Sequence, residues 1–91
     1  FMSDLSTQVI NYKVAVTTSA TEFTWTQRAK TVHLMTGLAT CHVKFGTGNA
    51  TTDDYLLPAN SDVKFKLGTS GGRLSVISSS GSGTLYVAIE E

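Results

Sequence analysis

The chain has 91 residues, and its seven Lys or Arg residues balance seven Asp or Glu residues to a formal net charge of zero. This length accommodates one domain with a single core, which buries roughly 60–65% of the unfolded surface, so a partner subunit would add useful burial. The neutral charge argues against a nucleic-acid-binding protein, because such proteins present a clustered basic surface.

Cys41 is the only cysteine, which excludes an intrachain disulfide and a cluster of thiolate metal ligands. No apolar stretch reaches the ~18 residues of a membrane span, so we expect no membrane partner. The N-terminus does not resemble a signal peptide, which indicates a protein made in the cytoplasm. We interpret Phe1, before Met2, as an expression remnant, expect a flexible N-terminus over residues 1–7, and assign residues 8–91 to one domain.

Apolar and polar residues alternate along most of the chain, which is typical of strands with one buried face. The alternation predicts strands over residues 8–17, 21–26, 30–36, 39–45, 61–67, 73–78 and 84–90. The residues expected to face inward are Ile10, Tyr12, Val14, Val16, Phe23, Trp25, Val32, Leu34, Ala39, Cys41, Val43, Phe45, Val63, Phe65, Leu67, Leu74, Val76, Leu85, Val87 and Ile89. About seven short strands separated by Gly and Ser indicate an all-β fold, a single-domain antiparallel β-sandwich or small barrel.

A tight hairpin is predicted after the third of these strands. Gly37 stands at the first central position of Thr-Gly-Leu-Ala, which suits a two-residue type II′ turn. This turn would set Leu34 opposite Cys41 on the inner face and His33 opposite His42 on the outer face.

The last strand is predicted to follow a second, longer hairpin over residues 78–84. Its sequence, Leu-Tyr-Val-Ala-Ile, is apolar on both faces. Either both faces are covered inside the sandwich, leaving Tyr86 partly exposed, or one face meets another subunit.

No catalytic or metal-binding constellation emerges from the residue types. His33 and His42 would need a third ligand to hold a metal, and the hairpin offers only the cationic Lys44 on that face. Asp53 and Asp54 are adjacent, so on a strand their carboxylates would diverge, and we interpret them as turn residues. We therefore expect no metal and no cofactor.

Nucleophilic and phosphate-binding motifs are also incomplete. The serines lack the Gly-x-Ser-x-Gly frame, and Cys41 faces inward. The glycine-rich stretches over residues 46–49 and 71–73 lack the Gly-Lys-Ser/Thr ending of a phosphate loop. We predict that the protein is not an enzyme.

The second half of the chain carries an ordered series of short motifs. They are Lys44-Phe45-Gly46-Thr47, Leu56-Leu57-Pro58-Ala59-Asn60, Val63-Lys64-Phe65 and Ser79-Ser80-Gly81-Ser82-Gly83-Thr84-Leu85-Tyr86-Val87. In this order they resemble small β-structured virion proteins of tailed bacteriophages and prophages, over residues 32–89. The Gly-rich tail expected after the last strand of such proteins is missing here.

The resemblance implies a non-enzymatic part of the virion, either a capsid decoration protein or a head–tail or tail component. Such a protein self-associates and docks on other virion proteins, without nucleic acid or membrane. We expect the interface to combine the last strand with the polar crossing before residue 61, through Tyr86, Ala88, Tyr55, Leu56 and Leu57.

The alternative function is a carbohydrate- or host-surface-binding module. It requires exposed, coplanar aromatic side chains beside a groove, and a buried Trp25 would weigh against it. For the crossing, the open question is whether the apolar residues before Pro58 fill the end of the protein's own core or fit a neighbouring molecule.

Overall fold

The computed structural model describes residues 9–90, which form six antiparallel strands and confirm the all-β prediction. The strands are β1 (Val9–Val16), β2 (Thr21–Thr36), β3 (Cys41–Phe45), β4 (Tyr55–Leu57), β5 (Asp62–Ser78) and β6 (Gly83–Glu90). The N-terminus predicted to be flexible, over residues 1–7, lies outside the described residues, as do Gln8 and Glu91.

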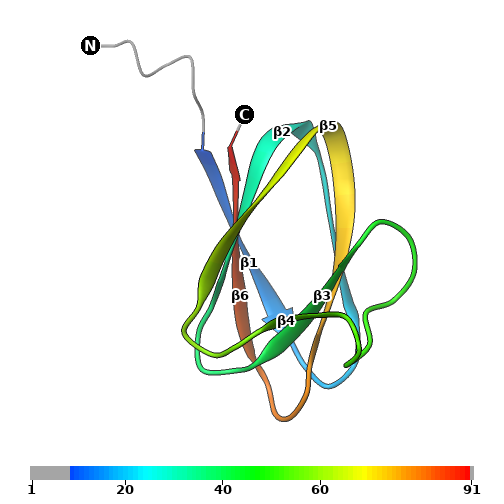
Figure 1. The fold of residues 1–91 in the computed structure, drawn as a ribbon, viewed down its shortest axis with the longest axis vertical. Helices are drawn as coiled ribbons and strands as arrows, with labels where there is room; N and C mark the ends of the chain where they lie inside the picture. The colour runs from blue at the N-terminus through cyan, green and yellow to red at the C-terminus, as the bar shows by residue number, and fades with distance from the viewer. Residues whose placement is uncertain (1–8, 91) are drawn as a thin grey trace.

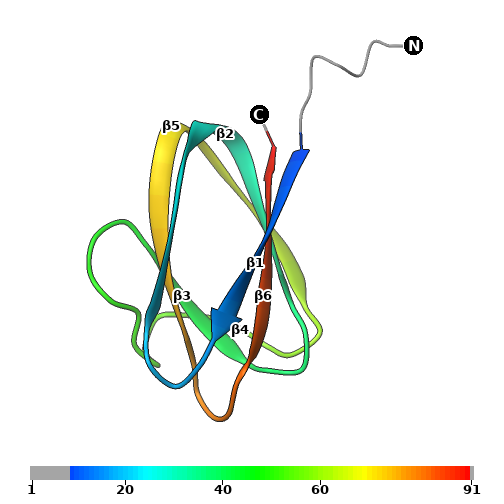
Figure 2. The same cartoon turned by 180° about the vertical axis from the view of Figure 1, so that it is seen from behind.

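The strands form one sheet in the order β1-β6-β2-β5-β3-β4, which curls over so that its two halves face each other (Figure 1). The β1–β6 half contains β1, β6, residues 31–36 of β2 and residues 62–66 of β5. The β3–β4 half contains β3, β4, residues 21–25 of β2 and residues 74–78 of β5. Strands β2 and β5 pair along most of their length and form a ribbon that passes from one half to the other, and Figure 2 shows this from behind.

The β2–β5 ribbon replaces four of the predicted short strands, so residues 9–90 form six strands, two of them long, where about seven short ones were predicted. On β2, the pairing register shifts between Trp25 and Arg28 and again between Ala29 and Thr31. Such bulges bend a strand without ending it. They also change which side chains face inward, from odd-numbered residues such as Trp25 to even-numbered residues such as Val32.

Strand β5 bends opposite these bulges, at a glycine-rich stretch. Gly68 and Gly71 have φ values of 66° and 79°, a left-handed conformation that glycine adopts at little cost. The alternation predicts two separate strands here, over residues 61–67 and 73–78. Because glycine permits the bend while pairing with β2 continues around it, the segment remains part of one strand.

Both predicted hairpins were wrong. Leu34 lies opposite Val63 and Val87, whereas Cys41 lies opposite Leu57 and Ser78. Strand β2 already has β5 and β6 as neighbours, so the chain after it crosses to the other half of the sheet. The segment between β5 and β6 crosses in the same way, because β6 pairs with β1 and β2.

The core lies between the two halves and contains most of the residues predicted to face inward. Fully enclosed members include Val16, Val32, Leu34, Leu74 and Leu85. Ala29 and Leu57 also belong to it, although the alternation did not identify them.

Aromatic pairs close the two open sides of the core. On one side the rings of Tyr12 on β1 and Phe23 on β2 lie 5.0 Å apart. On the other, Phe65 on β5 contacts both Phe45 on β3, at 4.9 Å, and Tyr55 on β4, at 5.3 Å. At these positions the rings connect strands that do not pair with each other. Strands β3 and β5 do pair, but through residues 74–78 of β5 and not near Phe65.

Candidate functional site

The outer face of the β1–β6 half is the candidate functional surface. Side chains alternate between the faces of a strand, and the register sets Lys13 beside Tyr86 and Tyr86 beside Met35. On the same face, two residues further along β6, Ala88 lies beside His33. Strand β6 therefore presents its second apolar row outward, between β1 and β2.

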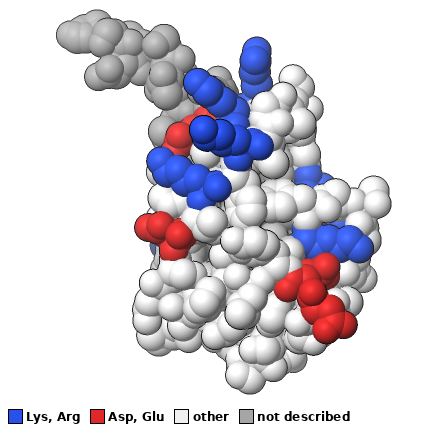
Figure 3. Space-filling model, in the orientation of Figure 1, with Lys and Arg blue, Asp and Glu red and all other residues white. Residues whose placement is uncertain are grey.

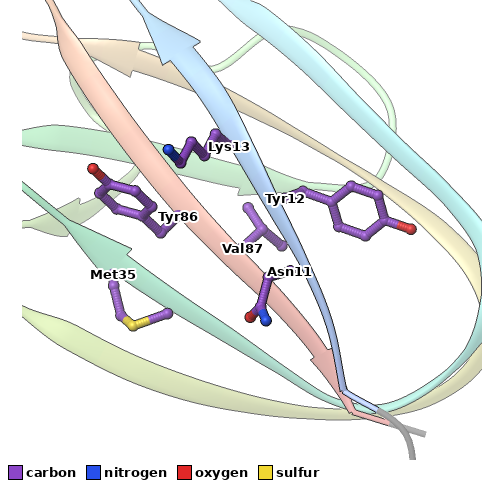
Figure 4. A pocket seen from close by; sticks show the side chains of 6 residues that line it. All are labelled: Asn11, Tyr12, Lys13, Met35, Tyr86 and Val87. Atoms are coloured by element: carbon purple, nitrogen blue, oxygen red, sulfur yellow. The ribbon is translucent and has the colours of Figure 1, made fainter.

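A shallow depression of about 300 Å³ lies on this face (Figure 4). It is lined by Asn11, Tyr12, Lys13, Met35, Tyr86 and Val87. The Lys13 side chain extends toward the Tyr86 ring, with Nζ 5.9 Å from the ring centroid, a distance suited to a cation–π contact. Tyr86 remains 40% exposed. The depression thus offers one aromatic ring and one methionine side chain to another molecule.

The structure does not bring the predicted interface residues together. Tyr86 lies near the middle of the β1–β6 half, whereas Tyr55 and Leu56 lie on β4, at the far edge of the other half. Leu57 and Ala88 are almost fully buried. Only the three exposed residues can contact another molecule without a rearrangement, and their role in an interface stays a prediction.

Lys13 and Met35 were not named as interface residues at the level of sequence. Met35 has the same parity as His33 in the predicted strand over residues 30–36, which puts it on the outer side of that strand. The alternation could not show that this strand pairs with the last one, which is what puts Met35 beside Tyr86. Leu38 is the most exposed large apolar residue among residues 10–90, at 89%, and the sequence does not single it out because it falls in the predicted tight turn.

The apolar residues of the crossing between β3 and β5 divide between the protein's own core and its surface. Leu57 enters the core, and Tyr55 packs on Phe65, while Leu56 points outward with 53% exposure. The backbone after Leu57 is held by Thr36, whose Oγ1 donates to the carbonyl of Pro58 at 2.6 Å. The crossing therefore closes one side of its own sandwich.

The two adjacent acids belong to a turn. The Asp54 carboxylate accepts a hydrogen bond from the Thr51 amide at 2.8 Å, and the Asp54 amide donates to the Thr51 carbonyl at 3.0 Å. The Asp53 amide donates to Thr51 Oγ1 at 3.2 Å, and its side chain is exposed. Their carboxylates do not share a partner, in agreement with the interpretation as turn residues.

The two histidines lie in different halves of the sheet, contrary to the hairpin prediction. His33 lies between Lys64 and Ala88, with Nε2 3.8 Å from a carboxylate oxygen of Asp62. His42 is buried on β3, and its Nδ1 lies 3.1 Å from the Asp54 carbonyl. The proposed juxtaposition of two imidazoles is therefore absent.

The two glycine-rich stretches meet around one arginine. The Arg73 guanidinium donates to the carbonyls of Gly46 and Gly48, each at 2.7 Å, and to the Glu22 carboxylate at 2.6 Å. The backbone also joins them, since the Gly46 amide donates to the Arg73 carbonyl at 2.9 Å. Because the guanidinium already has these partners, this arrangement stabilises a loop.

Reactive and metal-binding groups are not grouped in the described part of the chain. Cys41 is buried, and burial raises the pKa of its thiol. Within residues 9–90, no group of three or more His, Cys, Asp or Glu side chains is positioned to hold a metal ion. Over the same residues, no helix is long and apolar enough to cross a membrane.

The exposed cations are concentrated on the ribbon. Arg28 and Lys30 on β2 and Lys64 and Lys66 on β5 are all exposed, and Figure 3 shows several basic side chains grouped at the upper left of that view. Lys64 lies 3.7 Å from a Glu90 carboxylate oxygen. On the β5 side of the depression, the register places the exposed Asp62 beside Met35 and the exposed Lys64 beside His33.

No protein-family model matches the sequence, and no curated protein matches it either. Among solved structures, the chain is similar to a de novo designed double-stranded β-helix determined by solution NMR. The TM-score is 0.56 at 20% sequence identity, and the match covers 90% of this chain and 99% of that one. The likeness shows the fold, in which a curled antiparallel sheet is built around a paired ribbon of strands.

Proposed function

We propose that this protein is a non-enzymatic structural component that self-associates and docks on a larger assembly. Its sequence motifs resemble those of virion proteins, so the assembly we propose is the particle of a tailed bacteriophage or prophage. In that particle the chain would serve as a capsid decoration protein or as a head–tail or tail component.

The observation that carries this proposal is the outer face of β6. Tyr86 and Met35 border a depression of about 300 Å³ on an otherwise regular sheet face. Tyrosine and methionine are enriched where proteins bind one another, and exposed apolar groups that border a concave surface mark interaction sites. Lys13 adds a cation over the aromatic ring. A sheet face with such a centre suits docking on another protein surface.

The carbohydrate-binding alternative draws less support from the same residues. Trp25 is buried, and its indole N–H has no hydrogen-bond partner among the described residues, so it does not form an exposed platform for a sugar. The exposed tyrosines Tyr55 and Tyr86 lie on different halves of the sheet.

Particles of the phage or prophage that carries the gene provide the test of the virion proposal. Mass spectrometry of purified particles is expected to find the chain in a fixed ratio to a major capsid or tail protein. Recombinant Tyr86→Ser protein is expected to bind particles lacking the chain more weakly than Thr24→Ser protein, which is changed at an exposed residue of β2 in the other half of the sheet. A gene without portal, terminase or tail genes nearby, or particles without the chain, would contradict the proposal.

A further inference from the structure

The sheet leaves four strand edges without a backbone partner in the described part of the chain. These edges belong to β1, to β4, to residues 21–25 of β2 and to residues 62–66 of β5, each of which pairs on one side only. An unpaired edge presents a row of free N–H and C=O groups that can bind another strand.

Three of the four edges are poorly suited to such pairing. Strand β4 has only three residues. The edge of β2 is interrupted by the register shift after Trp25. The edge of β5 carries the exposed charges of Asp62, Lys64 and Lys66. Shortness, bulges and charges are the features by which natural sheets prevent edge-to-edge association.

Strand β1 is longer, unbroken and nearly uncharged. All eight of its residues pair in unbroken register with β6, from Val9 opposite Glu90 to Val16 opposite Gly83. Its sequence, VINYKVAV, contains no proline and a single charge, at Lys13. Alternate residues of such a strand direct their backbone groups away from β6, which leaves about four N–H and four C=O groups on the open side.

We propose that two copies of this chain pair through β1, antiparallel about a two-fold axis, and form one continuous sheet. This inference rests on the proposed self-association and names the contact that produces it. A second copy fits because a strand edge that meets itself about a two-fold axis is self-complementary, so that the free groups of one copy meet those of the other. The pairing joins four strands from each copy: β5, β2, β6 and β1.

The side chains of β1 select the register. Side chains must keep their faces, so residues of equal parity lie opposite each other. A register centred on Lys13 would set two lysines against each other, which is unfavourable. A register centred on Tyr12 instead sets Asn11 opposite Lys13 of the second copy and Ile10 opposite Val14 of the second copy. In that dimer both Tyr86 depressions open on the same face of the joined sheet, which enlarges the docking surface.

Substitutions that place either a positive or a negative charge at residue 11 test both the pairing through the β1 edge and its register. Asn11 is exposed, so neither Asn11→Lys nor Asn11→Glu should disturb the fold. Asn11→Lys creates two like-charge pairs across the axis and is expected to weaken the dimer about 2- to 30-fold, whereas Asn11→Glu should strengthen it by a similar factor. Thr24→Lys and Thr24→Glu, which change an exposed residue on the unpaired edge of β2, should leave the dimerisation constant unchanged.

Sedimentation equilibrium of these four variants and the wild type separates the possible outcomes. A wild-type monomer at all concentrations would overturn self-association itself. An oligomer that responds equally to Lys and Glu at residue 11, or to neither, would overturn only the β1 contact. Deletion of residues 1–8 should leave the dimer intact, and a dimer that forms or strengthens only after this deletion would assign the β1 edge to that segment instead.

Discussion

Trp25 lies over Gly72, its direct partner across the β2–β5 ribbon. A Cβ atom on Gly72 would overlap Cζ2 of the indole and lie 2.9 Å from Cε2. The glycine therefore makes room for the largest side chain of the protein next to the bulge that follows Trp25. This contact holds the ribbon at the point where it begins to pass from one half of the sheet to the other.

Replacing Gly72 with alanine is expected to lower the free energy of unfolding by about 1–3 kcal/mol, because the indole must move out of a packed position. Gly37→Ala is the matched control, since a Cβ there would contact nothing within 4 Å. Chemical denaturation of both variants provides the measurement. Equal stability of the two variants would show that the indole does not depend on the glycine.

Arg73 is expected to stabilise the loop between β3 and β4. Arg73→Ala removes hydrogen bonds to two backbone carbonyls and an ion pair with Glu22, and should lower the free energy of unfolding by about 1–2 kcal/mol after allowance for partial exposure. Arg73→Lys should rescue little of this loss, because the ammonium donates from a single nitrogen and lacks the planar fork with which the guanidinium reaches Glu22 through Nε and the two carbonyls through Nη1.

Arg28→Ala serves as the control for Arg73, because Arg28 is an exposed arginine on the same ribbon. Its effect on the denaturation midpoint should be close to zero. A similar loss at both arginines would mean that net charge, rather than the loop contacts, determines the result.

Thr36 is expected to anchor the end of the crossing, between β4 and β5. Its Oγ1 donates to the Pro58 carbonyl at 2.6 Å and accepts from the Ser61 amide at 3.0 Å. Thr36→Val keeps the shape but leaves the Ser61 amide without this acceptor and the Pro58 carbonyl with the Ser61 hydroxyl alone, at a cost of about 1–3 kcal/mol. Thr24→Val, at an exposed position of the same strand, should have little effect in the same denaturation experiment.

Cys41 is expected to resist thiol reagents in the folded protein. Burial raises the pKa of its thiol, so the reactive thiolate is scarce, and access is also blocked. The stability that the protonated thiol contributes is present below the unfolded-state pKa and is lost as the pH rises through the folded-state pKa. Labelling should therefore be slow until denaturant is added.

An exposed cysteine introduced as Ser80→Cys, on a Cys41→Ala background, should react rapidly under the same conditions. Rapid native labelling of Cys41 at neutral pH would contradict its burial.

The alternation of the sequence was sufficient to predict most of the side chains that enter the core, although not Ala29 or Leu57. Val32 and Leu34 face inward as expected, because each side of a strand meets a distinct environment wherever the strand pairs. The alternation could not predict that two short strands continue into each other. A bulge changes the parity of the inward-facing residues, as between Trp25 and Val32. In the sequence, such a change looks like the end of one strand and the start of another.

Connections were less predictable than strands, because a local turn signal does not report on distant pairing. Gly37 suits a hairpin, but β2 is already flanked by β5 and β6, so the chain must cross to the other half. For the same reason, the residues predicted to form one interface lie in different parts of the sheet. Tyr86 and Met35 become neighbours only through the pairing of β6 with β2, whose residues are separated by most of the chain.

Hydrogen exchange of the β1 amides at low and high protein concentration tests the self-association through β1 most directly. About half of these amides point away from β6, and they should exchange more slowly as the concentration rises. Amides over residues 21–25 of β2, the comparison edge, should not change. If exchange along β1 does not depend on concentration while the mass of the protein's oligomer increases, pairing through this strand would be contradicted.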